Sequence, residues 1–416
     1  MCRKSKRNRN CNIHLLKFMT QNQTEKLDKI LLHPFLGYII FLLIIGITFF
    51  LTFSIGNYPM ELMEKGVDYL AEFAQKSIPQ GFFNDLVVQG IIGGVGGVIV
   101  FLPNILILFL CISLMEESGY MSRASQLMDK FMHAIGLHGK SFAPLIMGFG
   151  CNVPAIMSTK FIEDKRDRLV TMLIIPFMSC SARLPVYIVI AGTFFPKYST
   201  LVMLCLYVLG VILAILFALL FKKTFNKSNH VPYTLNLQEY SIPKVKAVAR
   251  TIWVNCKDYL SKMAGIVLIA SVVLWLLMYF PQKDTNNIEE SYIAHAGKVI
   301  EPVMKPIGFD WKISVSLITG VAAKEIIIST LGVLYSDNPE TSSDILEEKL
   351  KSSGVFTPPV ALSFLVFTLI YFPCTAVFAA VKKESRLKWA IFVVTYTTVV
   401  AWILAFATYH ISGLFF

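Results

Sequence analysis

Long apolar stretches separated by short polar segments dominate the pattern of this chain. Each stretch is about 20 residues long, the length that a helix needs to cross the hydrocarbon core of a bilayer. The pattern predicts about seven full spans: 35–55, 91–115, 169–195, 200–222, 264–281, 359–380 and 389–412. Two further apolar segments, 141–158 and 313–335, are interrupted by glycine, proline or charged residues. We therefore expect an all-α polytopic membrane protein.

The composition supports this fold class. Of the 416 residues, 55% are hydrophobic and only 16% are charged, whereas soluble domains carry about 25% charged residues. The net charge of +11 does not indicate nucleic acid as a partner, because the basic residues are concentrated in particular loops. The expected partner of the surface is the lipid bilayer.

The distribution of charged residues predicts which loops face the cytoplasm. Basic residues concentrate in three segments: the N-terminus, 222–262 and 381–388. Acidic residues are frequent in 56–90, 282–310 and 336–352. Because cytoplasmic loops of membrane proteins carry an excess of Lys and Arg, we expect a multi-pass protein with a cytoplasmic N-terminus.

The sequence GLHGKS at 136–141 ends like a phosphate-binding loop but lacks the context of one. Ala134 stands where the motif requires its first glycine, and a segment with helical periodicity precedes it instead of a strand. The motif counts only between a strand and a helix. We therefore expect this chain to bind no nucleotide.

An internal repeat organises the chain. Residues 131–158 align with 303–330 without a gap, and eight of the 28 positions are identical. The charge pattern places both ends of 141–158 inside and both ends of 313–335 outside. This predicts an inverted repeat with two re-entrant or broken hairpins, an arrangement in which transporters hold their substrate near the bilayer midplane.

The repeat divides the chain into five expected segments. They are a cytoplasmic basic N-terminal segment (1–34), a first span with an external amphipathic segment (35–90), a first repeat (91–222), a cytoplasmic basic linker (223–262) and a second repeat (263–416).

Candidate cation ligands concentrate where the apolar segments break. Cys151 follows the glycines of the first hairpin tip, and Cys-Ser-Ala at Cys180 matches Cys-Thr-Ala at Cys374 in the second copy. Thiolate sulfur beside carbonyl or amide oxygens suits a borderline-soft divalent cation. These three cysteines are the candidate metal ligands, although cysteine also packs well as a small apolar residue. The candidate pathway residues beside them are Gly148, Gly150, Asn152, Ser181, Thr375, Lys324 and Glu325.

Charged residues inside apolar segments are a second candidate feature. Lys324 and Glu325 lie within the second hairpin, where a charge is costly and usually functional. The alternative is a structural ion pair of Glu325 with Arg183, which also lies inside a span. Glu116 and Glu117, with Arg123, are expected to form a solvated or gating cluster at a cytoplasmic helix end.

Several segments resemble the membrane portion of FeoB-type ferrous iron transport proteins. They include GLHGKSFAPLIMGFGCNVPAI, CSARLPVY and GVAAKEIIISTLG, and the resemblance covers about residues 24–412. The motifs GFGCNVPA and CSARLPVY are specific. It implies that Fe²⁺ is the transported substrate, that the membrane is the bacterial inner membrane, and that Cys151, Cys180 and Cys374 are ion-pathway residues. It also implies that the two repeats are Gate segments similar to those of concentrative nucleoside transporters.

The sequence departs from this family at its start. Members normally begin with a GTP-binding domain, and no P-loop is found here. Either a separate chain supplies that domain, or it was trimmed away, or this homologue works without it; the short basic leader favours a natural or split chain. The expected partners are therefore a separate GTP-binding subunit, a small cytoplasmic accessory protein and a second copy of the chain.

Two other functional classes remain open. A nucleoside or other solute symporter of related fold would have a site rich in Asn, Gln, Glu and aromatic residues, whereas the breaks here carry cysteine. A membrane scaffold for a separate GTPase would not need charges at the midplane. An enzyme should have a nucleophile–base pair or a metal dyad near one membrane face, and the sequence suggests neither. We expect a transporter and not an enzyme.

Overall fold

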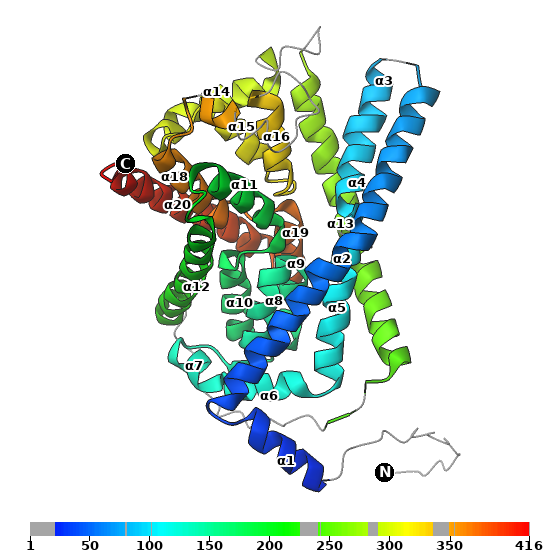
Figure 1. Ribbon diagram of the computed structural model, residues 1–416, viewed down its shortest axis with the longest axis vertical. Helices are drawn as coiled ribbons and strands as arrows, with labels where there is room; N and C mark the ends of the chain where they lie inside the picture. Colours follow the sequence, from blue (N-terminus) through cyan, green and yellow to red (C-terminus); the bar gives the residue numbers. More distant parts are fainter. Residues whose placement is uncertain are drawn as a thin grey trace, which may run out of the picture.

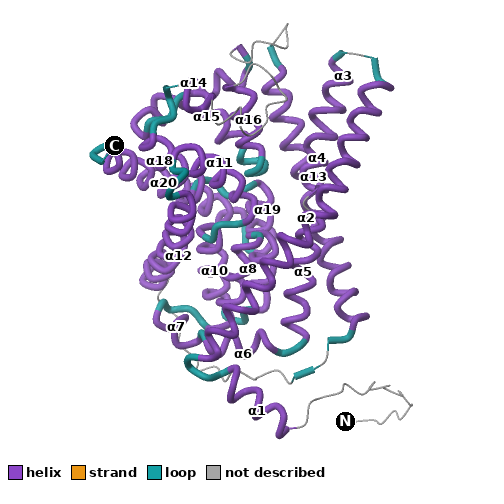
Figure 2. Tube along the Cα trace, viewed as in Figure 1, coloured by secondary structure: helices purple, strands orange, loops and turns teal. Residues whose placement is uncertain are grey.

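Every regular element that the structure describes is a helix (Figure 1). The computed structural model describes residues 21–79, 81–100, 102–224, 240–241, 243–281, 290–335, 349–352 and 354–415. Most of the described chain is helical, and loops and turns connect the helices (Figure 2). The predicted all-α fold class is confirmed.

A group of long helices forms one side of the molecule. α2 (Leu36–Ser77) is a single helix of 42 residues, whereas the sequence predicted a span at 35–55 followed by a separate amphipathic segment. The chain then returns alongside α2 (Figure 1). The returning elements are α3 (Phe82–Asp85), a π-helical segment (Leu86–Ile92), α4 (Gly93–Val100) and α5 (Leu102–Glu117). α13 (Val245–Tyr279) packs against α4 and α5. We call α2, α4, α5 and α13 the helical arm.

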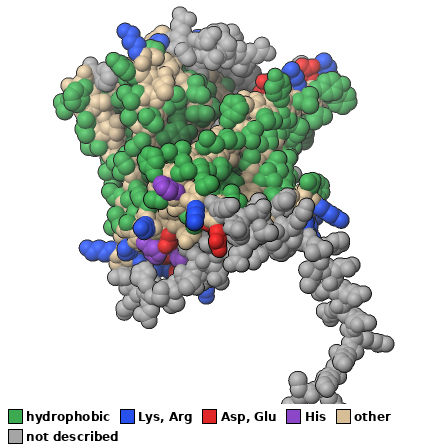
Figure 3. Space-filling view, turned by 60° about the horizontal axis from the view of Figure 1, so that its bottom comes forward, with side chains coloured by type: hydrophobic (Ala, Val, Ile, Leu, Met, Phe, Trp, Pro, Cys, Tyr) green, Lys and Arg blue, Asp and Glu red, His purple; other side chains and the backbone are tan. Residues whose placement is uncertain are grey.

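Short helices close one end of the molecule. α1 (Gln21–Leu31) lies there beside α6 (Tyr120–Leu127), which is bent by 83° relative to α5, and α7 (Asp129–Ala134) follows. Figure 3 shows charged and histidine side chains gathered near this end, while apolar side chains cover much of the body. This distribution is typical of a protein whose flanks contact lipid.

The two interrupted apolar segments of the sequence are broken helical hairpins. The first consists of α8 (Phe142–Gly150) and α9 (Asn152–Ser158), which pack against each other. The second consists of α15 (Trp311–Thr319) and α16 (Ile326–Tyr335), which do the same. Both breaks fall inside the segments that the sequence predicted to be interrupted.

Each hairpin is followed by the same succession of helices. After the first come α10 (Lys165–Ile174), α11 (Leu184–Phe194) and α12 (Ser199–Thr224). α14 (Tyr292–Met304) precedes the second hairpin, and after it come α18 (Pro358–Ile370), α19 (Thr375–Glu384) and α20 (Leu387–Ser412). α9 packs on α19 and α16 packs on α11. Each hairpin therefore contacts a helix of the other copy, beside the break in that copy's span.

Five helical stretches of the described chain are long and apolar enough to cross a membrane, or six if α5 and α6 form one bent span. The five are Leu36–Ser77, Lys165–Phe194, Ser199–Thr224, Pro358–Glu384 and Leu387–Ser412. The span predicted at 264–281 corresponds to a shorter apolar stretch of α13, Leu268–Tyr279. The chain is thus a polytopic membrane protein.

Packed aromatic side chains join the two copies. Phe177, between α10 and α11, stacks on Phe217 of α12 with ring centroids 4.9 Å apart. The Tyr396 ring of α20 packs on both, and its hydroxyl donates a hydrogen bond to the carbonyl of Leu173. The repeats therefore share a core, which fixes the two hairpins relative to each other.

Candidate functional site

The first hairpin breaks at Cys151, which has an extended backbone between α8 and α9 (φ −153°, ψ 128°). Close packing requires glycine at two positions just before this break. A Cβ at Gly148 would lie 2.9 Å from the Met178 side chain, and one at Gly150 would lie 2.7 Å from that of Leu108. Gly148 therefore lets the hairpin approach the next broken span, and Gly150 lets it approach α5.

The second hairpin breaks over residues 320–325, between α15 and α16. A Cβ at Gly320 would lie 2.5 Å from the hydroxyl oxygen of Tyr371, in the segment just before α19. The second tip therefore also packs closely against a broken span.

The same hydroxyl-to-carbonyl contact occurs in both copies. Ser181 donates a hydrogen bond through Oγ to the carbonyl of Gly150 at 2.9 Å, and Thr375 donates through Oγ1 to the carbonyl of Ala322 at 3.3 Å. The gapless alignment sets Gly150 opposite Ala322, and Ser181 and Thr375 occupy like places in the Cys-Ser-Ala and Cys-Thr-Ala segments. Equivalent positions of the sequence repeat thus form the same hydrogen bond at both hairpin tips.

The breaks surround a cavity of about 190 Å³. Cys151, Cys180 and Cys374 all line it, each half-buried. Six other residues singled out from the sequence line it as well: Gly150, Asn152, Ser181, Arg183, Lys324 and Glu325. A cavity of this size has room for several water molecules or a partly hydrated ion.

Other predicted residues do not line the cavity. Gly148 and Thr375 pack behind it, while Glu116 and Glu117 lie at the end of α5. Among the described residues, no three side chains of His, Cys, Asp or Glu are arranged to hold one metal ion. The structure therefore brings the three cysteines to one cavity without gathering them around a single point.

Buried oxygen atoms without hydrogen-bond partners face the same cavity. Asn152 Oδ1 is one, and its side chain is only 4% exposed. Asn104 Oδ1 of α5 and Ser271 Oγ of α13 are two more. Buried polar groups in folded proteins are nearly always paired, so three unpaired oxygens around one cavity indicate that it receives a ligand or water.

Asn104 and Ser271 were missed at the sequence level because they belong to the helical arm and not to the hairpins. A signal for Asn104 exists, since it is a polar residue within the apolar run FLPNILILF. Ser271 offers no such signal, because serine is common in membrane helices.

Two buried cations lie at the cavity. Arg183 is 1% exposed and donates to the carbonyls of Pro176 and Met178 at 3.2–3.3 Å. Lys324 is 2% exposed and donates to the carbonyl of Phe372 at 2.8 Å. In the described part of the chain no ion pair joins Arg183 to Glu325, so the structural ion pair considered from the sequence is not formed.

Arg123 forms an ion pair with a residue of α1. Its Nε lies 3.1 Å from Asp28 Oδ1 of α1, and its guanidinium covers the Tyr240 ring at 3.8 Å. The hydroxyl of Tyr240 donates to the same Asp28 oxygen at 2.8 Å. Burial and this hydrogen bond to Asp28 raise the pKa of Tyr240, so the phenol stays protonated. The cluster ties α1 and the segment before α13 to α6.

The GLHGKS turn is held by carboxylates. Gly139 donates its N–H to Asp129 Oδ1 at 2.9 Å, and His138 donates its N–H to Asp167 Oδ2 at 3.1 Å. Lys140 forms an ion pair with Glu163 at 2.9 Å. Groups that a phosphate-binding loop would turn toward phosphate are thus engaged by acidic side chains of the chain itself.

Comparison with known proteins identifies the family of this chain. The family model described as Gate, nucleoside recognition, matches residues 98–194 and 260–388. The model described as the C terminus of ferrous iron transport protein B matches residues 203–254. The chain belongs to the Gate family and represents the membrane part of a FeoB-type protein. The resemblance noted from the motifs is therefore confirmed.

Curated relatives cover nearly all of this FeoB-type chain. It is 48% identical to the Fe(2+) transport protein A/Fe(2+) transporter FeoB fusion protein of Porphyromonas gingivalis, across 94% of the chain and 52% of the relative. It is 43% identical to the Fe(2+) transporter FeoB of Campylobacter jejuni, across 94% of the chain and 66% of the relative. The chain thus spans between half and two thirds of the length of these relatives. No solved structure matches it.

Proposed function

We propose that this FeoB-type chain carries Fe²⁺ across the bacterial inner membrane through the cavity between the two hairpin tips. The observation that carries the proposal is the convergence of three cysteines and three unpaired oxygens on one cavity at helix breaks. Sulfur and oxygen together suit a borderline cation such as Fe²⁺ better than Mg²⁺ or Ca²⁺. The names of its relatives, which are Fe²⁺ transporters, support the same cargo.

The three cysteines are proposed to bind the ion in succession. Since no three described metal-ligating side chains surround one point, one or two cysteines would hold Fe²⁺ at a time. Asn152 Oδ1 would supply an oxygen ligand, and water would complete the shell. Weak binding at several positions favours passage, because an ion must be able to leave each position as well as enter it.

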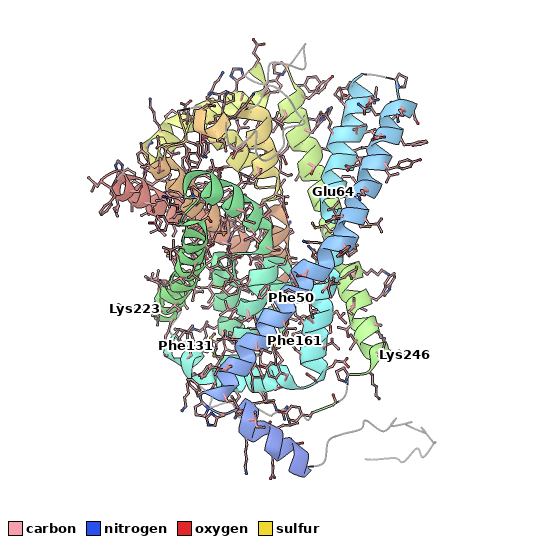
Figure 4. The ribbon with its side chains drawn as sticks, in the orientation of Figure 1. Phe50, Glu64, Phe131, Phe161, Lys223 and Lys246 are labelled. Atoms are coloured by element: carbon pink, nitrogen blue, oxygen red, sulfur yellow. The ribbon has the colours of Figure 1, made fainter. Side chains whose placement is uncertain are left out.

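The proposed topology follows from the distribution of charge. Lys223 and Lys246 lie toward the same end of the molecule as Phe131 (Figure 4). We propose that this end is cytoplasmic and that the N-terminus is on that side. About seven full spans with two re-entrant hairpins then form an inverted repeat, as in concentrative nucleoside transporters. The five segments defined from the sequence remain the proposed divisions of the chain.

Nucleotide and partner proteins are assigned to other chains or domains. We propose that residues 136–141 bind no nucleotide, because Asp129 and Asp167 already accept the N–H groups of that turn. A GTP-binding subunit and a small accessory protein are the proposed partners, and the fusion of transport protein A to FeoB in one relative supports the second. A second copy of the chain is a further proposed partner.

The test is Fe²⁺ uptake into proteoliposomes that contain this chain, with Cys151→Ser, Cys180→Ser and Cys374→Ser compared individually. Each replacement keeps the size of the side chain and exchanges soft sulfur for hard oxygen, so each should reduce uptake about tenfold or more. Cys205→Ser is the matched control, because Cys205 is exposed on α12 and does not line the cavity. Wild-type uptake in all three variants would refute the cysteine pathway.

A nucleoside symporter is the second candidate. The description of the Gate model and the two asparagines at the cavity favour it. Uridine uptake by the same proteoliposomes separates the candidates, because the iron proposal requires no uridine uptake and no competition between uridine and Fe²⁺.

A further inference from the structure

A buried cation caps the equivalent backbone carbonyl in each copy of the repeat. Alignment of Cys180 with Cys374 sets Met178 opposite Phe372. Arg183 donates through Nη1 to the Met178 carbonyl at 3.2 Å, and Lys324 donates through Nζ to the Phe372 carbonyl at 2.8 Å. Both carbonyls lie in non-helical backbone two residues before a cavity cysteine. Each break thus has a basic side chain hydrogen-bonded to one of its backbone carbonyls.

The two cations are held in different ways. Arg183 donates to carbonyls only five and seven residues before it, so it belongs to the break that it caps. Lys324 comes from the tip of the second hairpin and reaches 48 residues along the chain to its acceptor. Its ammonium also lies over the ring of Tyr371, 3.2 Å from the centroid. Lys324 therefore joins two separate elements through a single hydrogen bond and a ring contact.

In the first copy, Asn152 occupies the position that Lys324 has in the second copy. In the gapless alignment the two residues stand opposite each other, and both line the cavity. Asn152 presents an acceptor oxygen without a partner, whereas Lys324 presents an ammonium that covers an acceptor. The first copy therefore presents an unpaired oxygen, Asn152 Oδ1, to the cavity. In the second copy the Phe372 carbonyl oxygen already accepts a hydrogen bond from the Lys324 ammonium.

A divalent ion near Cys374 would compete directly with that ammonium. The Phe372 carbonyl and the Cys374 thiol belong to the same break, and Glu325 adjoins Lys324 in the cavity wall. Like charges repel strongly in surroundings of low dielectric constant. An ion in the cavity and an ammonium on the Phe372 carbonyl therefore disfavour each other.

We propose that Lys324 is a tethered cation that occupies the second half of the cavity when no cargo is present and leaves the Phe372 carbonyl when Fe²⁺ arrives. The inference rests on the proposed transport of Fe²⁺. The ammonium balances Glu325 in the empty cavity and keeps ion binding weak enough for release. Lys324 is thus a positioning residue that sets the affinity for cargo, while Arg183 is a fixed structural cap.

The experiment measures Co²⁺ binding to the purified full chain, with Co²⁺ as a redox-stable probe. Lys324→Met keeps the length of the side chain and removes its charge, so Co²⁺ should bind about tenfold tighter or more. Net Fe²⁺ uptake should nevertheless fall, because release becomes slower. Lys324→Arg keeps a cation and should retain an affinity within about threefold of the wild type. Lys312→Met is the control, since Lys312 lies 5.2 Å from the Tyr335 ring centroid but does not line the cavity.

Thermal unfolding distinguishes this role from a structural one. If Lys324 leaves the Phe372 carbonyl when metal binds, Lys324→Met should lower the unfolding midpoint temperature of the metal-free chain. It should not lower the unfolding midpoint temperature of the Co²⁺-saturated chain. A midpoint lowered equally in both states, with unchanged or weaker Co²⁺ binding, would overturn the inference. Lys324→Gln repeats the measurement if Lys324→Met does not fold.

The same data separate the two proposals. If the wild type binds Co²⁺ and Cys374→Ser abolishes that binding, a null result at Lys324 rejects the tethered cation alone. If the wild type binds no Co²⁺, the metal site and the tethered cation both fail.

Discussion

At the scale of single residues, the cavity gathers groups that a membrane interior normally excludes. Cys151, Cys180 and Cys374 lie where the backbone leaves the helical conformation, and irregular backbone at membrane depth is tolerated only where it is buried or lines a cavity. Asn152, Arg183 and Lys324 beside them are buried. Sequence patterns could locate these residues, because glycine, proline and charge interrupt an otherwise apolar run.

Asn152 provides a prediction at this scale. Asn152→Ala should weaken Co²⁺ binding by about 1–2 kcal/mol, roughly tenfold, because it removes an oxygen ligand. The thermal stability of the metal-free chain should not fall, since the lost Oδ1 has no partner there. Isothermal titration and thermal unfolding measure the two effects.

Thr368→Val is the matched control for Asn152. Thr368 Oγ1 is also buried without a partner, but the residue does not line the cavity. The control should leave Co²⁺ binding and Fe²⁺ uptake unchanged. If Asn152→Ala behaved in the same way, Asn152 would not be a ligand.

At the scale of elements, a hydroxyl of a broken span donates a hydrogen bond to each hairpin tip. The sequence predicted both hairpins and both breaks correctly, because those features depend on local residue types. It did not predict that α2 continues for 42 residues, since polar residues after position 55 resemble the start of a separate segment. Nor did it predict Asn104 and Ser271 in the site, because only the packing of the helical arm brings them there.

The two hydroxyl contacts should contribute equally to stability. Ser181→Ala and Thr375→Val should each lower stability by about 1 kcal/mol, the net contribution of one hydrogen bond. Each should also reduce Fe²⁺ uptake, because the tip then moves relative to the cysteines. Thr395→Val, which removes a hydroxyl bonded within α20, is the control. Loss of uptake in only one of the two variants would show that the tips do not work alike.

The cluster at α1 supports a further prediction. Arg123→Met should destabilise the chain by about 3 kcal/mol, because it leaves Asp28 without its guanidinium partner in a largely buried cluster. Tyr240→Phe should cost only about 1 kcal/mol, since it removes a single hydrogen bond. Thermal unfolding in detergent gives the order of the two effects, and equal midpoints for both variants would count against this account.

At the scale of the whole molecule, the two copies of the repeat share one core and one cavity. The topology that we propose can be tested with a membrane-impermeant maleimide on single cysteines placed at Lys223, Lys246 and Val299. The side chain of Val299 is 77% exposed on α14. Labelling of Lys223→Cys and Lys246→Cys should require access from the cytoplasmic side, whereas Val299→Cys should react from outside. The unmodified chain measures the background from native cysteines, and reaction of all three positions from one side would contradict the inverted repeat.

The cavity wall is only partly made by the hairpins. They supply Asn152 on one side and Lys324 on the other, while Asn104 and Ser271 come from α5 and α13, outside the aligned segments. A channel built from two identical halves would present equal barriers to an ion arriving from either end. Here the equivalent positions 152 and 324 differ by a full charge. The concentration gradient still sets the net flow, but the rates of loading from the two sides of the membrane need not match.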